Sequence, residues 1–116
     1  MATIAALGEW IAPGVHKTTW TALTSGDVAA AQNTGCLNSH SIMISGAADG
    51  GSLSIQVADT ATGTFVVTDD QNGDAASSLA TGISININGA FGAIKPVGTG
   101  GTSAQTYNVV MVSSKA

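Results

Sequence analysis

Few side chains in this sequence could perform acid–base chemistry or hold a metal ion. The chain contains two histidines, His16 and His40, and one cysteine, Cys36. Neither histidine has a cysteine, a second histidine or a carboxylate at the spacing of a metal site. Ser41 follows His40 directly, and neighbouring residues on a strand point to opposite faces, so the two form no nucleophile–base pair. The sequence therefore predicts a protein that is not an enzyme, without catalytic residues, cofactor or metal centre, and with Cys36 as a small buried side chain.

Two polar loops have the composition of ligand-binding motifs without their full pattern. Asp69–Asp74 places oxygen-bearing side chains around a glycine, as calcium loops do, but no glutamate completes the twelve-residue motif. We interpret this loop as a solvated turn, with calcium binding as the alternative. Gly98–Ser103 is as rich in glycine as a phosphate-binding loop. It lacks the lysine and does not join a strand to a helix, so we expect a flexible turn.

Composition excludes several classes of partner. The 116 residues suffice for one domain with one core, and the net charge is −4. Such a chain offers no basic surface for nucleic acid or for an anionic membrane. No segment approaches the roughly 20 apolar residues that span a bilayer, and the start of the chain lacks the positive charge of a signal sequence. A single cysteine allows no intramolecular disulfide, so we expect a protein made and used without secretion.

Alternating apolar residues predict β-strands on both sides of a glycine-rich loop. Isoleucines alternate with other residues in Ser41–Ser45, and aliphatic residues alternate with serine and glutamine in Ser52–Val57. The loop Gly46–Gly51 between them begins and ends with glycine, as a hairpin connection does. We therefore expect an antiparallel hairpin with one apolar face, which the remaining strands must cover.

The rest of the chain repeats this pattern of short strands and turns. Fifteen glycines are too many for strand interiors, where each costs about 0.5–1 kcal/mol relative to alanine, so most must lie in turns. Ala104–Ser114 is apolar on both faces, which indicates a central strand, and Pro96 indicates a strand edge or end. The fold class is therefore predicted to be all-β, a single antiparallel sandwich or barrel of about seven or eight short strands. The other expected strands are Val15–Leu23, Thr64–Thr68, Gly82–Asn88 and Phe91–Val97, with Val28–Ala31 extended or irregular.

The first fourteen residues are interpreted as an extended N-terminal arm that precedes a sandwich domain of residues 15–116. Pro13-Gly14 ends this segment. It is either a loosely docked terminus or an arm that reaches a neighbouring subunit. In the second case Trp10 and Ile11 are its anchors, because tryptophan is favoured where a large apolar area is buried at an interface.

A resemblance to a known family is carried by seven segments: Trp20–Asp27, Ser41–Gly46, Ser52–Val57, Thr62–Asp70, Gly82–Ile87, Ile94–Gly101 and Tyr107–Val112. In this order they resemble small β-rich virion proteins of tailed bacteriophages, of the capsid decoration or cement type. In such proteins an Ile-basic-Pro segment leads into a glycine-rich turn, and here Lys95 holds the basic position. The loop after Thr62 lacks the Asn-Asp-Gly-x-x-Trp run of the family and has Phe65 as its aromatic residue.

The resemblance implies a homo-oligomer, with a trimer favoured, that binds the major capsid protein on the outer surface of the capsid. Made in the host cytoplasm, it would become part of the virion and hold adjacent capsid subunits together. The contact residues expected from the sequence are Trp10, Ile11, Trp20 and Met111, of which Trp20 also fits in or near the core.

Two other functions remain open. One is a head-fibre or tail structural module of the virion. The other is a β-sandwich that binds a carbohydrate or a host surface. Such a site needs an exposed aromatic side chain beside polar groups, and Tyr107 and Trp20 are its candidates here.

Overall fold

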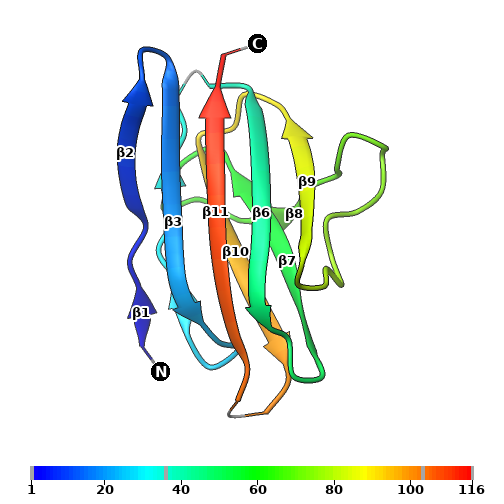
Figure 1. Cartoon of the computed structure of the whole chain (residues 1–116). Coiled ribbons are helices and arrows are strands. Elements are labelled where there is room, and N and C mark those ends of the chain that lie inside the picture. The colour runs from blue at the N-terminus through cyan, green and yellow to red at the C-terminus, as the bar shows by residue number, and fades with distance from the viewer. Residues whose placement is uncertain (1, 36, 103, 116) are drawn as a thin grey trace.

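Two antiparallel sheets, packed face to face, form this protein (Figure 1). The structure is a computed structural model that describes residues 2–35, 37–102 and 104–115, so the expected burial of Cys36 lies outside the described residues. Within them the chain is all strand and loop, as predicted, and no helix is long and apolar enough to cross a membrane. The strands are β1 Thr3–Ile4, β2 Leu7–Ala12, β3 Val15–Leu23, β4 Val28–Ala29, β5 Gln32–Asn33, β6 Ser39–Ala47, β7 Gly51–Ala58, β8 Val66–Val67, β9 Ile83–Asn88, β10 Ala93–Gly100 and β11 Thr106–Ser114.

The larger sheet has five strands in the order β2-β3-β11-β6-β9, and the smaller has four in the order β5-β10-β7-β8. A short parallel pair, β1 with β4, lies beside them. β11 occupies the middle of the larger sheet between β3 and β6, as its apolar residues on both faces predicted. Burial alternates along β11 with a period of two, because one face of the strand packs on the core.

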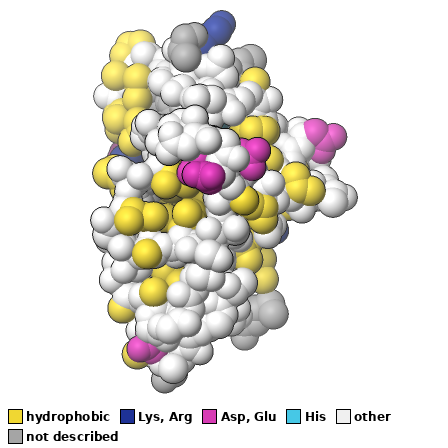
Figure 2. All heavy atoms as spheres, turned by 90° about the vertical axis from the view of Figure 1, so that its right-hand side faces the viewer, with side chains coloured by type: hydrophobic (Ala, Val, Ile, Leu, Met, Phe, Trp, Pro, Cys, Tyr) yellow, Lys and Arg dark blue, Asp and Glu magenta, His cyan; other side chains and the backbone are white. Residues whose placement is uncertain are grey.

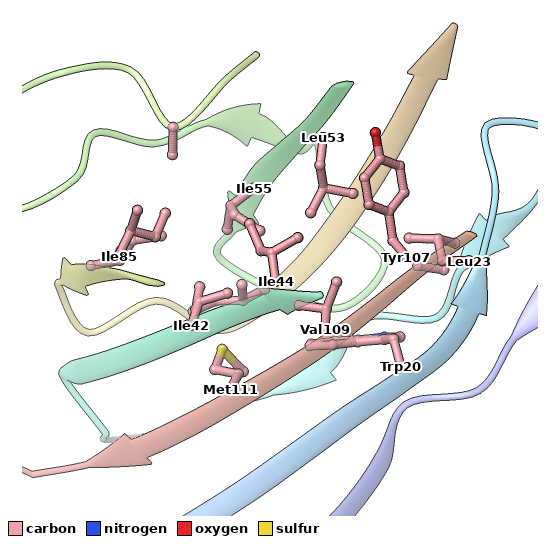
Figure 3. Close-up of a cluster of buried hydrophobic side chains, with 14 of the residues drawn as sticks. Trp20, Leu23, Ile42, Ile44, Leu53, Ile55, Ile85, Tyr107, Val109 and Met111 are labelled. Carbon is pink, nitrogen blue, oxygen red and sulfur yellow. The ribbon is translucent and has the colours of Figure 1, made fainter. Parts of the chain in front are cut away.

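The connection between β6 and β7 corrects the expected hairpin. Asp49 and Gly50 have φ values of +48° and +85°, and the Gly51 N–H donates to the Ala48 carbonyl at 2.9 Å, the geometry of a type I′ turn. Hairpins favour such turns, yet β6 and β7 lie in different sheets, because β11 and β9 take both edges of β6. The turn therefore carries the chain from one layer to the other. The apolar faces of the two strands meet across the core instead of lying side by side (Figure 3).

The core lies between the two sheets and consists of aliphatic side chains around the aromatic residues Trp20 and Tyr107 (Figure 3). Ile44 of β6 and Ile55 of β7 are both buried there and come from opposite sheets. Each such side chain contributes about 1.5–3 kcal/mol when it is fully buried rather than exposed. The fold therefore rests on many medium-sized contacts, which explains how a chain so poor in aromatic residues forms a single core.

One end of the sandwich is held by the buried side chain of Gln105, which precedes β11. Its Oε1 accepts the Ser25 N–H at 2.7 Å, and its Nε2 donates to the carbonyls of Ala48 at 3.1 Å and Thr99 at 3.4 Å. A Cβ atom at Gly51 would collide with this amide, so glycine is required there. Gln105 thus links the turn after β3, the β6–β7 turn and the end of β10.

The segment expected as an N-terminal arm is extended. Each of its two strands pairs with another strand of the same chain. β1 lies parallel to β4, and β2 forms an antiparallel hairpin with β3. Trp20 anchors the segment after β4 by donating its indole N–H to the Ala30 carbonyl at 2.7 Å. In the folded chain β2 is therefore the outer strand of the larger sheet.

Strand limits agree with the sequence pattern in most places. Val15–Leu23 coincides with β3, whereas the strand expected at Thr64–Thr68 shortens to the two residues of β8. Pro96 lies inside β10, but β5 pairs with β10 only at Ala93 and Ile94. The proline therefore falls where that side of β10 is unpaired, and its missing N–H removes no ladder hydrogen bond.

Candidate functional site

β2 and β3 form a tight hairpin at the outer edge of the larger sheet. Pro13 and Gly14 make the two-residue turn, and Gly14 has a φ of +75°, as the second central position of a type II turn requires. Glu9 lies opposite Lys17 across the hairpin, with 3.9 Å between carboxylate and ammonium. Both side chains are exposed, so this ion pair contributes at most about 1 kcal/mol. The turn fixes β2 against β3 and leaves its other edge facing outward.

Three large apolar side chains of β2 are exposed, and we call them the β2 patch. Leu7 is 62% exposed, Trp10 64% and Ile11 52%. A shallow hollow lined by residues 10–14 adjoins them. Leu7 and Trp10 lie on opposite faces of β2, so the patch surrounds the edge strand. Burial of apolar surface contributes about 25 cal/mol per Å², and exposed apolar side chains gathered in one place mark interaction surfaces. Trp10 and Ile11 therefore lie where a partner could reach them.

The two edges of the larger sheet differ. At the β9 edge, the Gln71 N–H donates to the Asn86 carbonyl and Gln71 Oε1 accepts the Asn86 N–H, both at 2.9 Å. At the β2 edge, nothing in the described part of the chain pairs with the outer side of the strand (Figure 1). An unpaired strand edge is a template for another chain. Exposed apolar side chains and unpaired backbone therefore coincide at β2.

Two of the four expected contact residues are buried, which corrects the prediction for them. Trp20 is 1% exposed and Met111 is 0% exposed. Both point between the sheets, because their positions in β3 and β11 fall on the core side of the alternation (Figure 3). Tyr107, expected as an exposed aromatic residue for a carbohydrate site, is buried as well. The exposed tryptophan of this fold is Trp10.

A groove runs between the β2–β3 hairpin and the segment that contains β5, and we call it the Trp10 groove. Its lining consists of Trp10, His16, residues 32–35 and Leu37. The Trp10 and His16 rings are in edge-to-face contact with centroids 4.9 Å apart. The groove thus combines an exposed indole with imidazole, amide and hydroxyl groups, a set of side chains that suits a small polar ligand.

The second histidine, His40, is a buried structural residue. Its Nε2 lies 3.1 Å from the Gly89 carbonyl and its Nδ1 lies 2.8 Å from Ser113 Oγ. A carbonyl only accepts, so Nε2 carries the hydrogen and Nδ1 accepts from the serine hydroxyl. Burial lowers the pKa of His40 below its ordinary value. Ser41 points to the opposite, exposed face, where its hydroxyl donates to Asn86 Oδ1 at 2.9 Å.

The polar loops use their side chains within their own turns. Asp70 Oδ1 accepts the backbone N–H groups of Asn72 at 2.8 Å and Asp74 at 3.1 Å, as in the solvated turn expected there. In the described ranges no three histidine, cysteine, aspartate or glutamate side chains are grouped to hold a metal ion. The segment expected as a flexible glycine turn begins as strand, because residues 98–100 belong to β10, and Ser103 lies outside the described residues.

Other exposed apolar side chains are more dispersed. Figure 2 looks onto the side that carries β9 and the long polar loop, where hydrophobic side chains lie in several groups between polar side chains, backbone and a few acidic side chains. Met43 on β6 and Val67 on β8 are exposed examples elsewhere in the fold. Lys95 places its ammonium 4.3 Å from the centre of the Phe65 ring, a cation–π contact that ties β10 to the loop before β8. The cation–π contact thus stabilises a loop, whereas Met43 and Val67 are exposed apolar residues outside the β2 patch.

Sequence reasoning missed part of both surfaces. Leu7 could have been found from the Pro13-Gly14 turn, because such a turn can close a hairpin. The strand before it would then expose alternate side chains, Leu7 among them. Gln32 and Asn33 carried no signal, since they lie in a short segment without hydrophobic periodicity.

The fold is similar to that of a solved protein from a prophage. The SPBc2 prophage-derived protein YomS superposes with a TM-score of 0.65 over 90% of this chain and 98% of that chain, at 14% sequence identity. Hydroxypropylphosphonic acid epoxidase from S. wedmorenis gives a TM-score of 0.45 at 12% identity and covers 87% of this chain but 44% of that chain, a likeness too loose to inform function. No protein-family model matches the chain, and no curated protein sequence matches it. The comparisons thus establish a fold shared with a prophage-derived protein.

Proposed function

We propose that this protein is a structural component of a tailed-phage virion, of the kind that decorates and cements the capsid. The observation that carries the proposal is the β2 patch, a set of exposed apolar side chains on both faces of an edge strand that no described strand pairs with on its outer side. The fold shared with a prophage-derived protein over 90% of the chain supports a phage origin. The role is adhesion, and the protein performs no catalysis.

The proposed partner is the major capsid protein, bound where adjacent subunits meet on the outer surface of the capsid. Copies of the chain form a homo-oligomer on that surface, with a trimer favoured. A protein that binds the assembled lattice better than free subunits stabilises the lattice by mass action. Few charges and an apolar patch suit a persistent contact better than an electrostatically steered, transient one.

Substitution of the patch tests this role. Leu7→Ser combined with Ile11→Ser removes exposed apolar surface without touching the buried core. We expect the double variant to bind particles at least about tenfold more weakly, as when central apolar residues of an interface are truncated. The measurement is co-sedimentation of purified protein with phage particles assembled without it.

Matched surface substitutions supply the control. Met43→Ser combined with Val67→Ser removes apolar side chains of similar exposure outside the patch, and particle binding should stay unchanged. Equal binding by wild type and the patch variant would remove β2 from the contact. Electron microscopy of labelled protein on particles separates decoration of the head from a head-fibre or tail position, and a tail position would contradict the cement role.

A further inference from the structure

The Trp10 groove has a built geometry that the adhesion role does not use. Trp10 lies opposite His16 in the β2–β3 ladder, and Gly8 lies opposite the buried Thr18. Opposite residues share a face, so Gly8, Trp10 and His16 all point to the side of the smaller sheet. β5 covers only a short stretch there, with two residues paired to β10, and the indole of Trp10 stays exposed.

The floor of the groove depends on a glycine. A Cβ atom on Gly8 would lie 2.7 Å from His16 Cε1 and 3.1 Å from Gln32 Oε1, so the imidazole and the amide lie directly over the backbone of β2. His16 Nδ1 lies 3.4 Å from Thr18 Oγ1, which orients the ring. The result is a fixed array of one indole, one imidazole and one amide along a single wall.

Polar groups of the groove remain available to a ligand. Gln32 donates through Nε2 to the Asn33 carbonyl at 2.8 Å. Gln32 lies opposite the buried Ile94 and so faces the larger sheet, whereas Asn33 points to the outer side. In the described residues, Gln32 Oε1 and His16 Nε2 have no hydrogen-bond partner. An amide offers one acceptor and two donor hydrogens, which matches the paired donor and acceptor character of neighbouring hydroxyl groups.

The charge of the lining narrows the ligand class. The lining contains no carboxylate and no ammonium group. The nearby Glu9–Lys17 pair occupies the alternate positions of the hairpin and so points to the opposite face. A phosphate or a zwitterion would find no counter-charge, whereas an uncharged molecule with one apolar face and several hydroxyls fits an indole beside amides.

We propose that the Trp10 groove binds a neutral saccharide, with the C–H face of one sugar ring packed on Trp10 and its hydroxyls hydrogen-bonded to Gln32 and His16. The groove is shallow and lies on the face of β2 opposite Leu7. Trp10 belongs to both the groove and the β2 patch, so the variants Leu7→Ser and Gln32→Ala, each confined to one of the two surfaces, distinguish failure of saccharide binding from failure of capsid binding.

The test is a titration of the full chain, labelled with nitrogen-15, with methyl glycosides of glucose, galactose, mannose and N-acetylglucosamine. Concentrations reach about 50 mM, because shallow sites with few contacts bind in the millimolar range. The indole N–H of Trp10 should shift and saturate with at least one sugar. The indole N–H of Trp20, buried and bonded to Ala30, should stay in place and serves as the internal control.

Two variants assign the shifts to the groove. Trp10→Ala and Gln32→Ala should each weaken binding by about tenfold or more while the Trp20 indole signal shows that the core is intact. Leu7→Ser, on the other face of β2, should bind the sugar as wild type does. The proposal is overturned if no sugar gives a saturable shift, or if shifts survive in the Trp10 variant. It is also overturned if the Trp10 signal changes with protein concentration alone, which would assign the groove to a contact between copies of the chain.

Discussion

His40 illustrates, at the scale of single residues, how a side chain suited to chemistry can serve the fold. It joins β6 to β11 through Ser113 and to the end of β9 through Gly89, and its ring lies near that of Phe91, with centroids 6.4 Å apart. Both ring nitrogens are used by neutral partners. The imidazole is thus held in its uncharged form, and its protonation lowers the stability of the folded state.

This histidine should make stability depend on pH. Because burial lowers its pKa from the ordinary 6.5, the unfolded chain binds a proton more readily than the folded chain. Its contribution is present above pH 6.5 and is lost as the pH falls through the lower, folded-state pKa. The free energy of unfolding, measured in urea at pH 7 and pH 5, should drop in wild type. The drop should shrink in His40→Gln, and an equal drop in both proteins would assign the acid sensitivity to other groups.

Ala22 is strained, and relief of the strain should stabilise the protein. It has a φ of +57° at a bulge in the β3–β11 ladder, where its N–H donates to Asn108 Oδ1 at 3.0 Å. Glycine adopts this conformation without a Cβ penalty, so Ala22→Gly should raise the free energy of unfolding by about 0.5–1 kcal/mol. Ala47→Gly, in an ordinary exposed strand position of β6, should lower it by a similar amount. Denaturant unfolding of both variants checks the contrast, and a loss of stability in both would refute it.

Elements were predictable from the sequence to the extent that local pattern defines them. Alternation identified β3, β9 and β11, and apolar residues on both faces placed β11 in the centre. The partner of β6 was not predictable, because an Asp49-Gly50 turn suits a hairpin and a link between sheets equally well. That choice depends on which strands fill the edges of β6, and these lie about 40 and 60 residues further along the chain.

Gln105 is the element-scale link most open to test. Gln105→Ala leaves the Ser25 N–H and the Ala48 carbonyl without their partner. Both hydrogen bonds are partly buried, and each such bond contributes about 0.5–1.5 kcal/mol, so the free energy of unfolding should fall by about 1–3 kcal/mol. Gln71→Ala, which removes an exposed hydrogen bond at the β9 edge, should cost less than about 1 kcal/mol. Equal losses in chemical denaturation would show that Gln105 does not hold the three connections together.

For the molecule as a whole, the sequence led us to expect an adhesive protein, but it identified only some of the residues that are exposed for contact. Trp10 and Ile11 are exposed, whereas Trp20 and Met111 are buried. Residue type alone cannot separate them, because a tryptophan suits a core and an interface equally. Only the position of β2 at the sheet edge exposes Trp10, and that position follows from the pairing of β3 with both β2 and β11.

Association of copies through β2 should make thermal stability depend on concentration. Binding that favours the folded, associated state raises Tm as protein concentration rises. Solution mass and Tm should therefore both increase across a dilution series of wild type. The dependence should disappear in Leu7→Ser with Ile11→Ser and persist in Met43→Ser. A monomer mass and a constant Tm throughout would eliminate the homo-oligomer while leaving capsid binding to be judged separately.

The hydrogen bonds of Gln71 to Asn86 on β9 bear on how copies of the protein can associate. Gln71 occupies the outward backbone groups of Asn86 on β9, so in the described structure β2 is the less obstructed margin of the larger sheet. Strand pairing of β2 with β2 joins two copies, so the favoured trimer requires contacts other than β2–β2 strand pairing.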